Sequence, residues 1–226
     1  MRLVIATPCY QGVVTTQYLR SMLQTITKAS AEGIDISVLT VDSDSFIIRS
    51  RNNCADVCLK AGFDKLLFID SDISWEFSHI KKLLSSGKAV VGGSYRLKTP
   101  DAEILNFNPL KKHTNYFKAS TKTKAEVDCF IQKAADSSGL VEVTHIPTGF
   151  LLIDSSVFHT IKNFTSLYYS NGEERYNFFP SAVHNGILES EDWGFCRLCA
   201  TAGIPVWFDT TVILDHVGSS VFSWTR

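Results

Sequence analysis

LLFIDSD, residues 66–72, decides the fold: four apolar residues lead into two aspartates separated by one serine. Short continuous apolar runs of this kind are typical of strands buried on both faces in a parallel sheet. Upstream, apolar runs at 3–7 and 36–41 alternate with amphipathic segments at 16–31 and 49–61. This order predicts a strand–helix–strand–helix–strand unit that ends with a strand at 65–69 and has its ligand crevice at the carboxyl ends of the strands.

The alternating pattern continues downstream but is interrupted once. Further helices are predicted at 76–85, 155–161 and 189–202, and further strands at 89–91, 141–145, 150–153 and 206–208. Residues 99–138 between them are polar and Lys-rich, and loops of this length are more often functional or disordered than inert. We expect one α/β domain over 1–226, with halves 1–98 and 139–226 joined by this excursion, either as the whole protein or as part of a longer one.

Composition excludes several functional classes. The 22 Lys and Arg residues against 23 Asp and Glu leave a formal charge of −1, so the basic surface of a general nucleic-acid binder is missing. No apolar run approaches the roughly 18 to 20 residues that a membrane span needs, and the N-terminus enters a strand-like segment directly. We expect a soluble cytosolic protein with a continuous core, without a membrane span or a nucleic-acid partner.

The six cysteines are expected to be reduced, because they are too few for a disulfide scaffold in a chain of this length. Cys54 and Cys58, and likewise Cys196 and Cys199, are spaced closely enough for a zinc site. Both pairs lie among apolar residues of predicted helices, where free cysteine behaves as a small hydrophobe. We therefore favour core packing over zinc.

Asp70 and Asp72 follow the buried strand and are separated by one residue. On an extended segment, residues i and i+2 face the same side, so both carboxylates can address one hard cation at the crevice. A divalent cation there can neutralise a diphosphate leaving group. The structural alternative is that Asp72 only caps the following helix.

A third metal ligand is suggested near the C-terminus. His216 follows a strand-like run and precedes Val217 and Gly218. A lone histidine is usually structural, but a neutral imidazole beside an acid pair is a common ligand for transition metals. With Asp70 and Asp72, His216 favours Mn²⁺ over Mg²⁺.

An acid cluster at 189–193 opens the predicted helix that carries Phe195 and Leu198. Acids at a helix N-terminus are stabilised by the helix dipole, which is the structural interpretation. The functional interpretation is that Glu191 or Asp192 acts as a general base on an attacking hydroxyl.

Four other segments are predicted near the crevice. Guanidinium groups and backbone N–H groups at a helix start suit phosphate binding, a strand end suits a nucleobase, and glycine lets a ligand approach the main chain. Each segment is also compatible with ordinary turn chemistry. The residues concerned are Arg49, Arg51 and Asn52; Thr7, Pro8, Cys9 and Tyr10; Gly92 and Gly93; and Thr148 and Gly149.

Taken in order, these segments resemble the GT-A fold glycosyltransferases, in particular small DxD enzymes of bacteria, phages and large DNA viruses, including chlorella viruses. The resemblance covers most of the chain. It rests on Arg51-Asn52, FIDSD at 68–72, VGGSY at 91–95, TGF at 148–150, SEDWGFC at 190–196 and His216-Val217-Gly218.

The resemblance implies a mainly parallel, mixed central sheet flanked by helices, in the Rossmann-like arrangement of nucleotide-diphospho-sugar transferases. It further implies a UDP-sugar donor, a glycan acceptor, Mn²⁺ or Mg²⁺ as cofactor and a cytoplasmic location, that of the host for a viral protein. Asp72 would be the main metal ligand, Asp70 with Ser71 would lie near ribose and metal, and Asp192 would be the base of an inverting reaction. In these terms residues 1–98 are the nucleotide-binding half, 99–138 a variable excursion or lid, and 139–226 the acceptor-side half.

Two alternatives remain open at this stage. A catalytically silent relative or carbohydrate-binding module would bind glycan without nucleotide, using tryptophans as stacking faces. A sugar-nucleotidyltransferase is disfavoured, because the first strand is not followed by a glycine-rich loop with a basic residue: residues 7–12 read TPCYQG.

Overall fold

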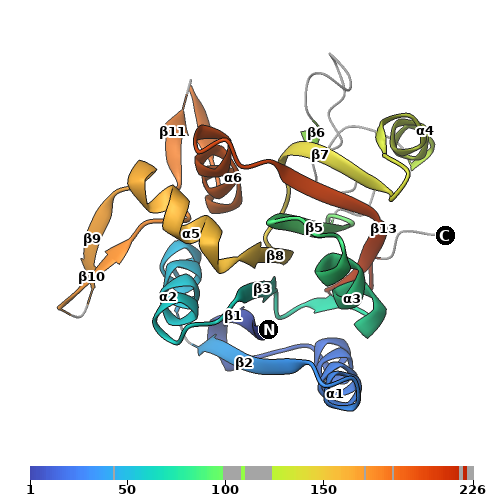
Figure 1. Ribbon diagram of the computed structural model, residues 1–226, viewed down its shortest axis with the longest axis horizontal. Helices are drawn as coiled ribbons and strands as arrows, with labels where there is room; N and C mark the ends of the chain where they lie inside the picture. The colour runs from blue at the N-terminus through green and yellow to red at the C-terminus, as the bar shows by residue number, and fades with distance from the viewer. Residues whose placement is uncertain are drawn as a thin grey trace.

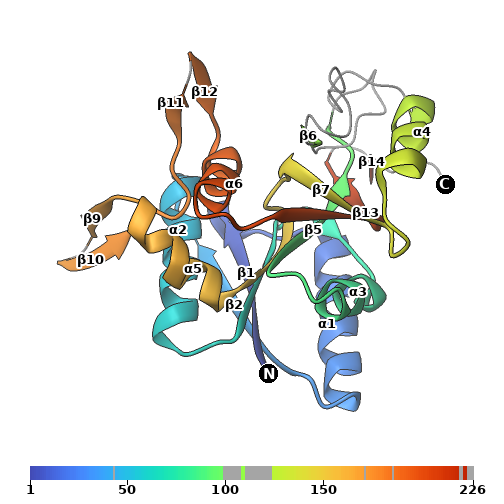
Figure 2. The same cartoon turned by 45° about the horizontal axis from the view of Figure 1, so that its top comes forward.

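The computed structural model describes residues 1–42, 44–98, 108–109, 124–170, 172–184, 186–218 and 221–222. Helices cover both faces of one large mixed sheet, and two small separate hairpins extend beyond the helices on one side (Figures 1 and 2). The expected α/β class, with a mainly parallel central sheet flanked by helices, is confirmed. Most of the predicted excursion at 99–138 lies outside the described residues.

The helices are α1 (Thr16–Ala31), α2 (Ile47–Lys60), α3 (Phe77–Ser85), α4 (Lys124–Ala134), α5 (Ser155–Ile161) and α6 (Glu191–Thr201), with short 3-10 turns η1 (Tyr10–Gly12) and η3 (Lys162–Phe164). The strands of the large sheet are β1 (Arg2–Cys9), β2 (Asp35–Asp42), β3 (Lys65–Ile69), β4 (Ile73–Ser74), β5 (Val90–Tyr95), β6 (Asn108–Pro109), β7 (Leu140–His145), β8 (Phe150–Asp154), β13 (Val206–Val217) and β14 (Val221–Phe222). The hairpins are β9 (Leu167–Ser170) with β10 (Glu173–Tyr176), and β11 (Ala182–His184) with β12 (Ile187–Glu189).

The main path of the sheet has the strand order β2-β1-β3-β8-β5-β13-β7-β6. Strands β2, β1, β3, β5 and β13 run in one direction, because β1 pairs in parallel with β2 and β3, β5 pairs in parallel with β13, and β8 joins β3 to β5 antiparallel to both. The carboxyl ends of β3, β5 and β13 therefore meet at one edge. The Asp-Ser-Asp loop follows β3 at this edge.

The two faces of the sheet bury separate hydrophobic clusters. Helices α1 and α3 cover one face with Tyr18, Met22, Phe77 and Ile80. Helices α2, α5 and α6 cover the other face, where Phe158 of α5 packs against Phe195 of α6 and against Phe179, and residues of α2 belong to the same cluster. Burial on both faces explains why the central strands are uninterrupted apolar runs.

The cysteines predicted to pack in the core do so. Cys54, Cys58, Cys196 and Cys199 are at most 1% exposed and belong to the same cluster as Phe158. Burial raises the pKa of Cys54, Cys58 and Cys196 to about 12, so these groups stay as thiols at neutral pH. All six cysteines are free.

The elements from β1 to α3 lie within about two residues of their predicted ranges, and α1 matches at both ends. Thr15 caps α1 by accepting a hydrogen bond from the Tyr18 backbone N–H at 3.2 Å, which is how a threonine N-cap fixes a helix start. The capping interpretation of Asp72 is wrong, because α3 starts later and Glu76 is its N-cap.

One prediction near the end of the first half is wrong. Strand β5 continues to Tyr95, so Gly92 and Gly93 lie inside a buried strand rather than in a turn. A Cβ on Gly92 would lie 2.8 Å from the carbonyl oxygen of Phe150, and one on Gly93 would lie 2.7 Å from that of Val212. These glycines therefore permit close packing within the sheet.

Helix α4 and both hairpins were not predicted from the sequence. Val127 and Phe130 of α4 are buried in the core cluster, although the segment around them is polar. Among the described residues, no helix is long and apolar enough to cross a bilayer.

Candidate active site

The loop after β3 is held by its backbone from three sides. The N–H of Asp70 donates to the carbonyl of Gly149 at 3.0 Å, and the carbonyl of Ser71 accepts from the N–H of Thr15 at 3.0 Å. The carbonyl of Asp72 accepts from the N–H of Val217 at 2.8 Å. Three distant segments therefore fix where the two aspartates point, which is the support that a precise site requires.

Strand β4, directly after this loop, explains why Asp72 and His216 lie together. It pairs antiparallel with the end of β13, with Ile73 opposite His216. Nε2 of His216 lies 3.5 Å from Oδ2 of Asp72, and its Nδ1 lies 3.0 Å from the backbone carbonyl of Arg96. Because a carbonyl can only accept, Nδ1 carries the proton and Nε2 faces the carboxylate.

Lys98 also reaches Asp72, and its ammonium group forms an ion pair with Oδ2. Burial disfavours the charged form of Asp72, but the neighbouring His216 and Lys98 side chains outweigh it and hold the pKa of this carboxyl below its ordinary value. Asp72 is therefore a carboxylate at neutral pH, surrounded by positive and polar groups.

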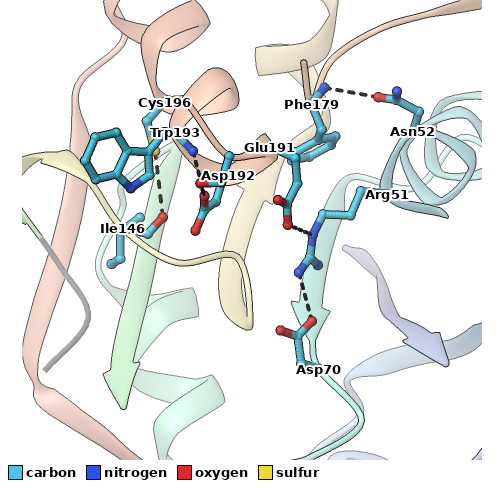
Figure 3. Close-up of polar contacts among 10 residues, drawn as sticks. Arg51, Asn52, Asp70, Ile146, Phe179, Glu191, Asp192, Trp193 and Cys196 are labelled. Atoms are coloured by element: carbon cyan, nitrogen blue, oxygen red, sulfur yellow. Dashed lines mark hydrogen bonds and ion pairs between the residues drawn. The ribbon is translucent and has the colours of Figure 1, made fainter. Parts of the chain in front are cut away.

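Asp70 has a different partner. Arg51 of α2, whose side chain is 4% exposed, donates from Nη2 to Oδ1 of Asp70 at 3.0 Å and from Nε to Oε1 of Glu191 at 3.2 Å (Figure 3). The guanidinium lies over the ring of Phe68, 5.2 Å from its centroid. Arg51 thus links the aspartate loop to the start of α6.

Asp192 lies apart from that network. In Figure 3 its carboxylate points away from Glu191 and Arg51. Oδ1 of Asp192 accepts from the backbone N–H of Trp193 at 2.8 Å and from the hydroxyl of Ser190. Within the described part of the chain Asp192 makes no ion pair, so the two adjacent acids have different environments.

Tyr95, at the end of β5, lies between these groups and was not singled out as a site residue. It packs edge-on against His216 with ring centroids 4.8 Å apart. Burial raises the pKa of Tyr95 well above its ordinary value, and the charge of Asp70 adds to the shift. A Cβ on Gly149 would lie 2.8 Å from Oδ2 of Asp70 and would also overlap the Tyr95 hydroxyl, so only glycine fits there.

The structure separates the residues predicted at the end of the first strand. Thr7 is buried, and its hydroxyl lies 2.5 Å from that of Tyr18, so it packs against α1. Pro8 and Cys9 are also buried. Tyr10 is 59% exposed and is the member of this group that is available to a ligand.

Arg49, Asn52 and Thr148 also have defined positions. Arg49 lies on the exterior of α2 and contacts Asp44 through two hydrogen bonds, of 2.8 and 2.7 Å. Asn52 points toward the segment after β10 and accepts from the N–H of Phe179 at 3.1 Å. Thr148 is buried in the turn before β8.

The predicted metal ligands are brought together only in part. Asp72 and His216 are in contact, whereas Asp70 contacts Arg51. No group of three or more His, Cys, Asp or Glu residues forms a metal-binding cluster in the part of the chain that the structure describes. A pair of ligands is consistent with a cation that takes its remaining ligands from a bound diphosphate.

Comparison with known proteins supports the fold. No protein-family model matches the sequence, and no curated protein matches it. The fold is similar to that of A197 from STIV, with a TM-score of 0.57 and 15% identity over 100% of this chain and 95% of that one. At this identity the likeness concerns the fold alone.

Two further solved structures are more distant. Residues 1–349 of S. aureus TarS give a TM-score of 0.43 and 14% identity, over 93% of this chain and 61% of that one. Mannose-1-phosphate geranyltransferase from Thermus thermophilus gives a TM-score of 0.34 and 12% identity, over 72% of this chain and 59% of that one.

Proposed function

We propose that the protein is a metal-dependent glycosyltransferase that moves a hexose or deoxyhexose from a UDP-sugar to a glycan hydroxyl with inversion. The observation that carries the proposal is the contact between Asp72 and His216 at the carboxyl edge of the sheet. These residues are far apart in the sequence, and the β4–β13 pairing brings them together. The sequence resemblance to DxD glycosyltransferases agrees with this assignment.

The donor atoms of this pair suit a divalent cation. When Nδ1 of His216 donates to the Arg96 carbonyl, Nε2 and Oδ2 of Asp72 face each other as two acceptors 3.5 Å apart. Two acceptors at that distance are stabilised by a proton or a cation between them. A histidine fixed through its second nitrogen is the usual arrangement of a metal ligand.

Mn²⁺, or Mg²⁺, would be held by Asp72 and His216 together with diphosphate oxygens. When bound, such an ion supplies positive charge to the diphosphate as it leaves. Lys98 forms an ion pair with Asp72 and must move aside or turn to the phosphates when the ion binds. Arg51 holds the carboxylate of Asp70 in place for contact with the ribose.

Asp192 is the better candidate for the base. Glu191 is bound to the buried guanidinium of Arg51, which occupies one of its oxygens. Asp192 has no such partner among the described residues and points elsewhere. In the reaction, the acceptor oxygen bonds to the anomeric carbon, its proton passes to Asp192, and the bond from that carbon to the diphosphate breaks with its electron pair on the leaving group.

The test is release of UDP from UDP-sugars, measured with and without Mn²⁺. Wild-type protein should hydrolyse at least one UDP-hexose or UDP-deoxyhexose slowly in a Mn²⁺-dependent way, and Asp72→Asn should abolish this. Lys98→Met is the matched variant on the same carboxylate: it removes the competing ammonium, so lower Mn²⁺ concentrations should suffice.

The alternatives predict different results in that assay. A carbohydrate-binding relative would bind glycan and release no UDP from any sugar nucleotide. A nucleotidyltransferase would instead release pyrophosphate from UTP and a sugar 1-phosphate. Either result would remove the proposed function.

A further inference from the structure

A pocket lies beside α2, between the start of that helix and the β9–β10 hairpin. Its volume is about 360 Å³, which is at the lower end for ligand pockets and suits a mono- or disaccharide. We infer that it binds a sugar ring of the glycan acceptor, an inference that rests on the proposed function. Its lining includes Phe46, Arg49, Asn52, Tyr168, Tyr169 and Asn177.

The walls of this pocket carry aromatic rings that remain exposed. Tyr169 of β9 is 76% exposed, and Phe46, immediately before α2, is 52% exposed. Tyr168 completes the aromatic lining and is partly buried. Exposed aromatic rings beside a pocket leave apolar surface in contact with water, which is unfavourable until a ligand covers it. The apolar face of a sugar ring can stack on such a surface.

The floor supplies neutral hydrogen-bonding groups in fixed positions. Nδ2 of Asn52 donates to Oδ1 of Asn177 at 3.0 Å, and Oδ1 of Asn52 accepts from the N–H of Phe179. Ser166 and Ser170 line the pocket as well. Amides and hydroxyls are the groups that pair with the hydroxyls of a sugar.

The charge of the pocket favours a neutral ligand over a phosphate. Arg49 is its cationic residue, and both of its hydrogen bonds to Asp44 are short, at 2.8 and 2.7 Å. The pair leaves the lining close to neutral. A nucleotide diphosphate would therefore gain less here than beside Lys98 and the predicted cation site.

The hairpin is anchored to α2, so the pocket is formed before any ligand binds. Arg175 of β10 donates to the side chain of Asn53, and Lys60 forms an ion pair with Glu173 at 2.9 Å. Figure 2 shows the β9–β10 hairpin projecting beside α2 and α5. A preformed pocket lowers the entropic cost of binding.

The position of Asn52 relates this pocket to the reaction site. Asn52 follows Arg51, whose guanidinium contacts Asp70 and Glu191, and the two side chains leave the helix in different directions (Figure 3). An acceptor chain held in the pocket would therefore be anchored on the same helix that carries Arg51.

The experiment is saturation-transfer NMR of the full chain with methyl glycosides of common hexoses, deoxyhexoses and N-acetylhexosamines. At least one glycoside should bind wild-type protein, and Tyr169→Ala should weaken it about tenfold, as expected for loss of a stacking ring. Phe46→Ala should act in the same direction. The matched control is Phe164→Ala, which removes a 48% exposed ring outside the pocket and should leave binding unchanged.

Three results would overturn the inference: no glycoside binds the wild type, Tyr169→Ala and Phe164→Ala bind equally well, or UDP with Mn²⁺ displaces the bound glycoside. Failure of the proposed function has a separate signature. If wild-type protein binds no UDP with or without Mn²⁺, while a glycoside still binds in a Tyr169-dependent way, the sugar pocket stands and the transferase does not.

Discussion

Replacement of Arg51 by methionine should destabilise the fold more than any surface charge substitution. Arg51 is 4% exposed at its side chain and pairs with Asp70 at 3.0 Å and Glu191 at 3.2 Å. Removing one member of a buried ion pair costs about 3–5 kcal/mol, because the remaining charges are left without a partner. Asp70 is 27% and Glu191 16% exposed, so water recovers part of this loss and we expect about 3 kcal/mol.

Urea unfolding at pH 7 measures this loss as a lower midpoint at unchanged slope. In a thermal scan, a loss of about 3 kcal/mol corresponds to a melting temperature lower by about 6–12 °C for a chain of this size. Arg49→Met is the matched control, since Arg49 also forms a two-bond contact with an aspartate but is exposed. If Arg51→Met loses no more stability than Arg49→Met, the buried network does not stabilise the fold.

Three further predictions concern the base, the partly buried His145 and the sheet. Asp192→Asn should reduce turnover by about 10² to 10⁴ while UDP affinity stays nearly unchanged. If Glu191→Gln shows this loss and Asp192→Asn does not, Glu191 is the general base. Burial lowers the pKa of His145 below 6.5, so the unfolded state binds the proton first and the free energy of unfolding falls as the pH drops through about 6. His145→Phe should therefore lose less stability than the wild type between urea unfolding curves at pH 7 and pH 5. An equal loss in both proteins would contradict this prediction. Gly93→Ala should cost about 1–3 kcal/mol in urea unfolding because its Cβ would lie 2.7 Å from the Val212 carbonyl oxygen, and wild-type stability would show that the sheet relaxes.

The sequence predicts the elements whose signals are local. Helix α1 has an amphipathic period and a threonine N-cap at Thr15, and its range agrees at both ends. The buried strands β1 and β3 are short apolar runs between helices. Such features depend on neighbouring residues alone, so a single sequence contains them.

The hairpins were missed although a signal for each is present. Asn-Gly dipeptides stand at 171–172 and 185–186, the usual turn of a two-residue hairpin, and Gly172 and Gly186 adopt φ of 79° and 76°. Their strands are short and largely exposed, so they lack the apolar alternation that marks a buried strand. The turn residues were the better evidence.

The residues of the candidate site could be predicted from the sequence, but not which of them contact one another. The ends of β3 and β13 were expected to share an edge, yet the contact of Asp72 with His216 depends on the two-residue strand β4, which has no sequence signal of its own. The ion pair between Arg51 and Glu191 joins residues 140 positions apart. Such contacts are set by tertiary packing, and a pattern along one chain does not contain them.

The central claim is that Asp72 and His216 hold the cation that binds the donor's diphosphate. Isothermal titration calorimetry of UDP into the full chain, with and without Mn²⁺, tests it most directly, using His216→Ala and Asp72→Asn beside Phe164→Ala as control. We predict that UDP binds wild-type and control proteins far more tightly with Mn²⁺ than without it, and that Asp72→Asn loses this difference and His216→Ala reduces it. UDP binding that is equally tight with and without Mn²⁺ in the wild type, or a Mn²⁺ dependence retained in Asp72→Asn, would contradict the account.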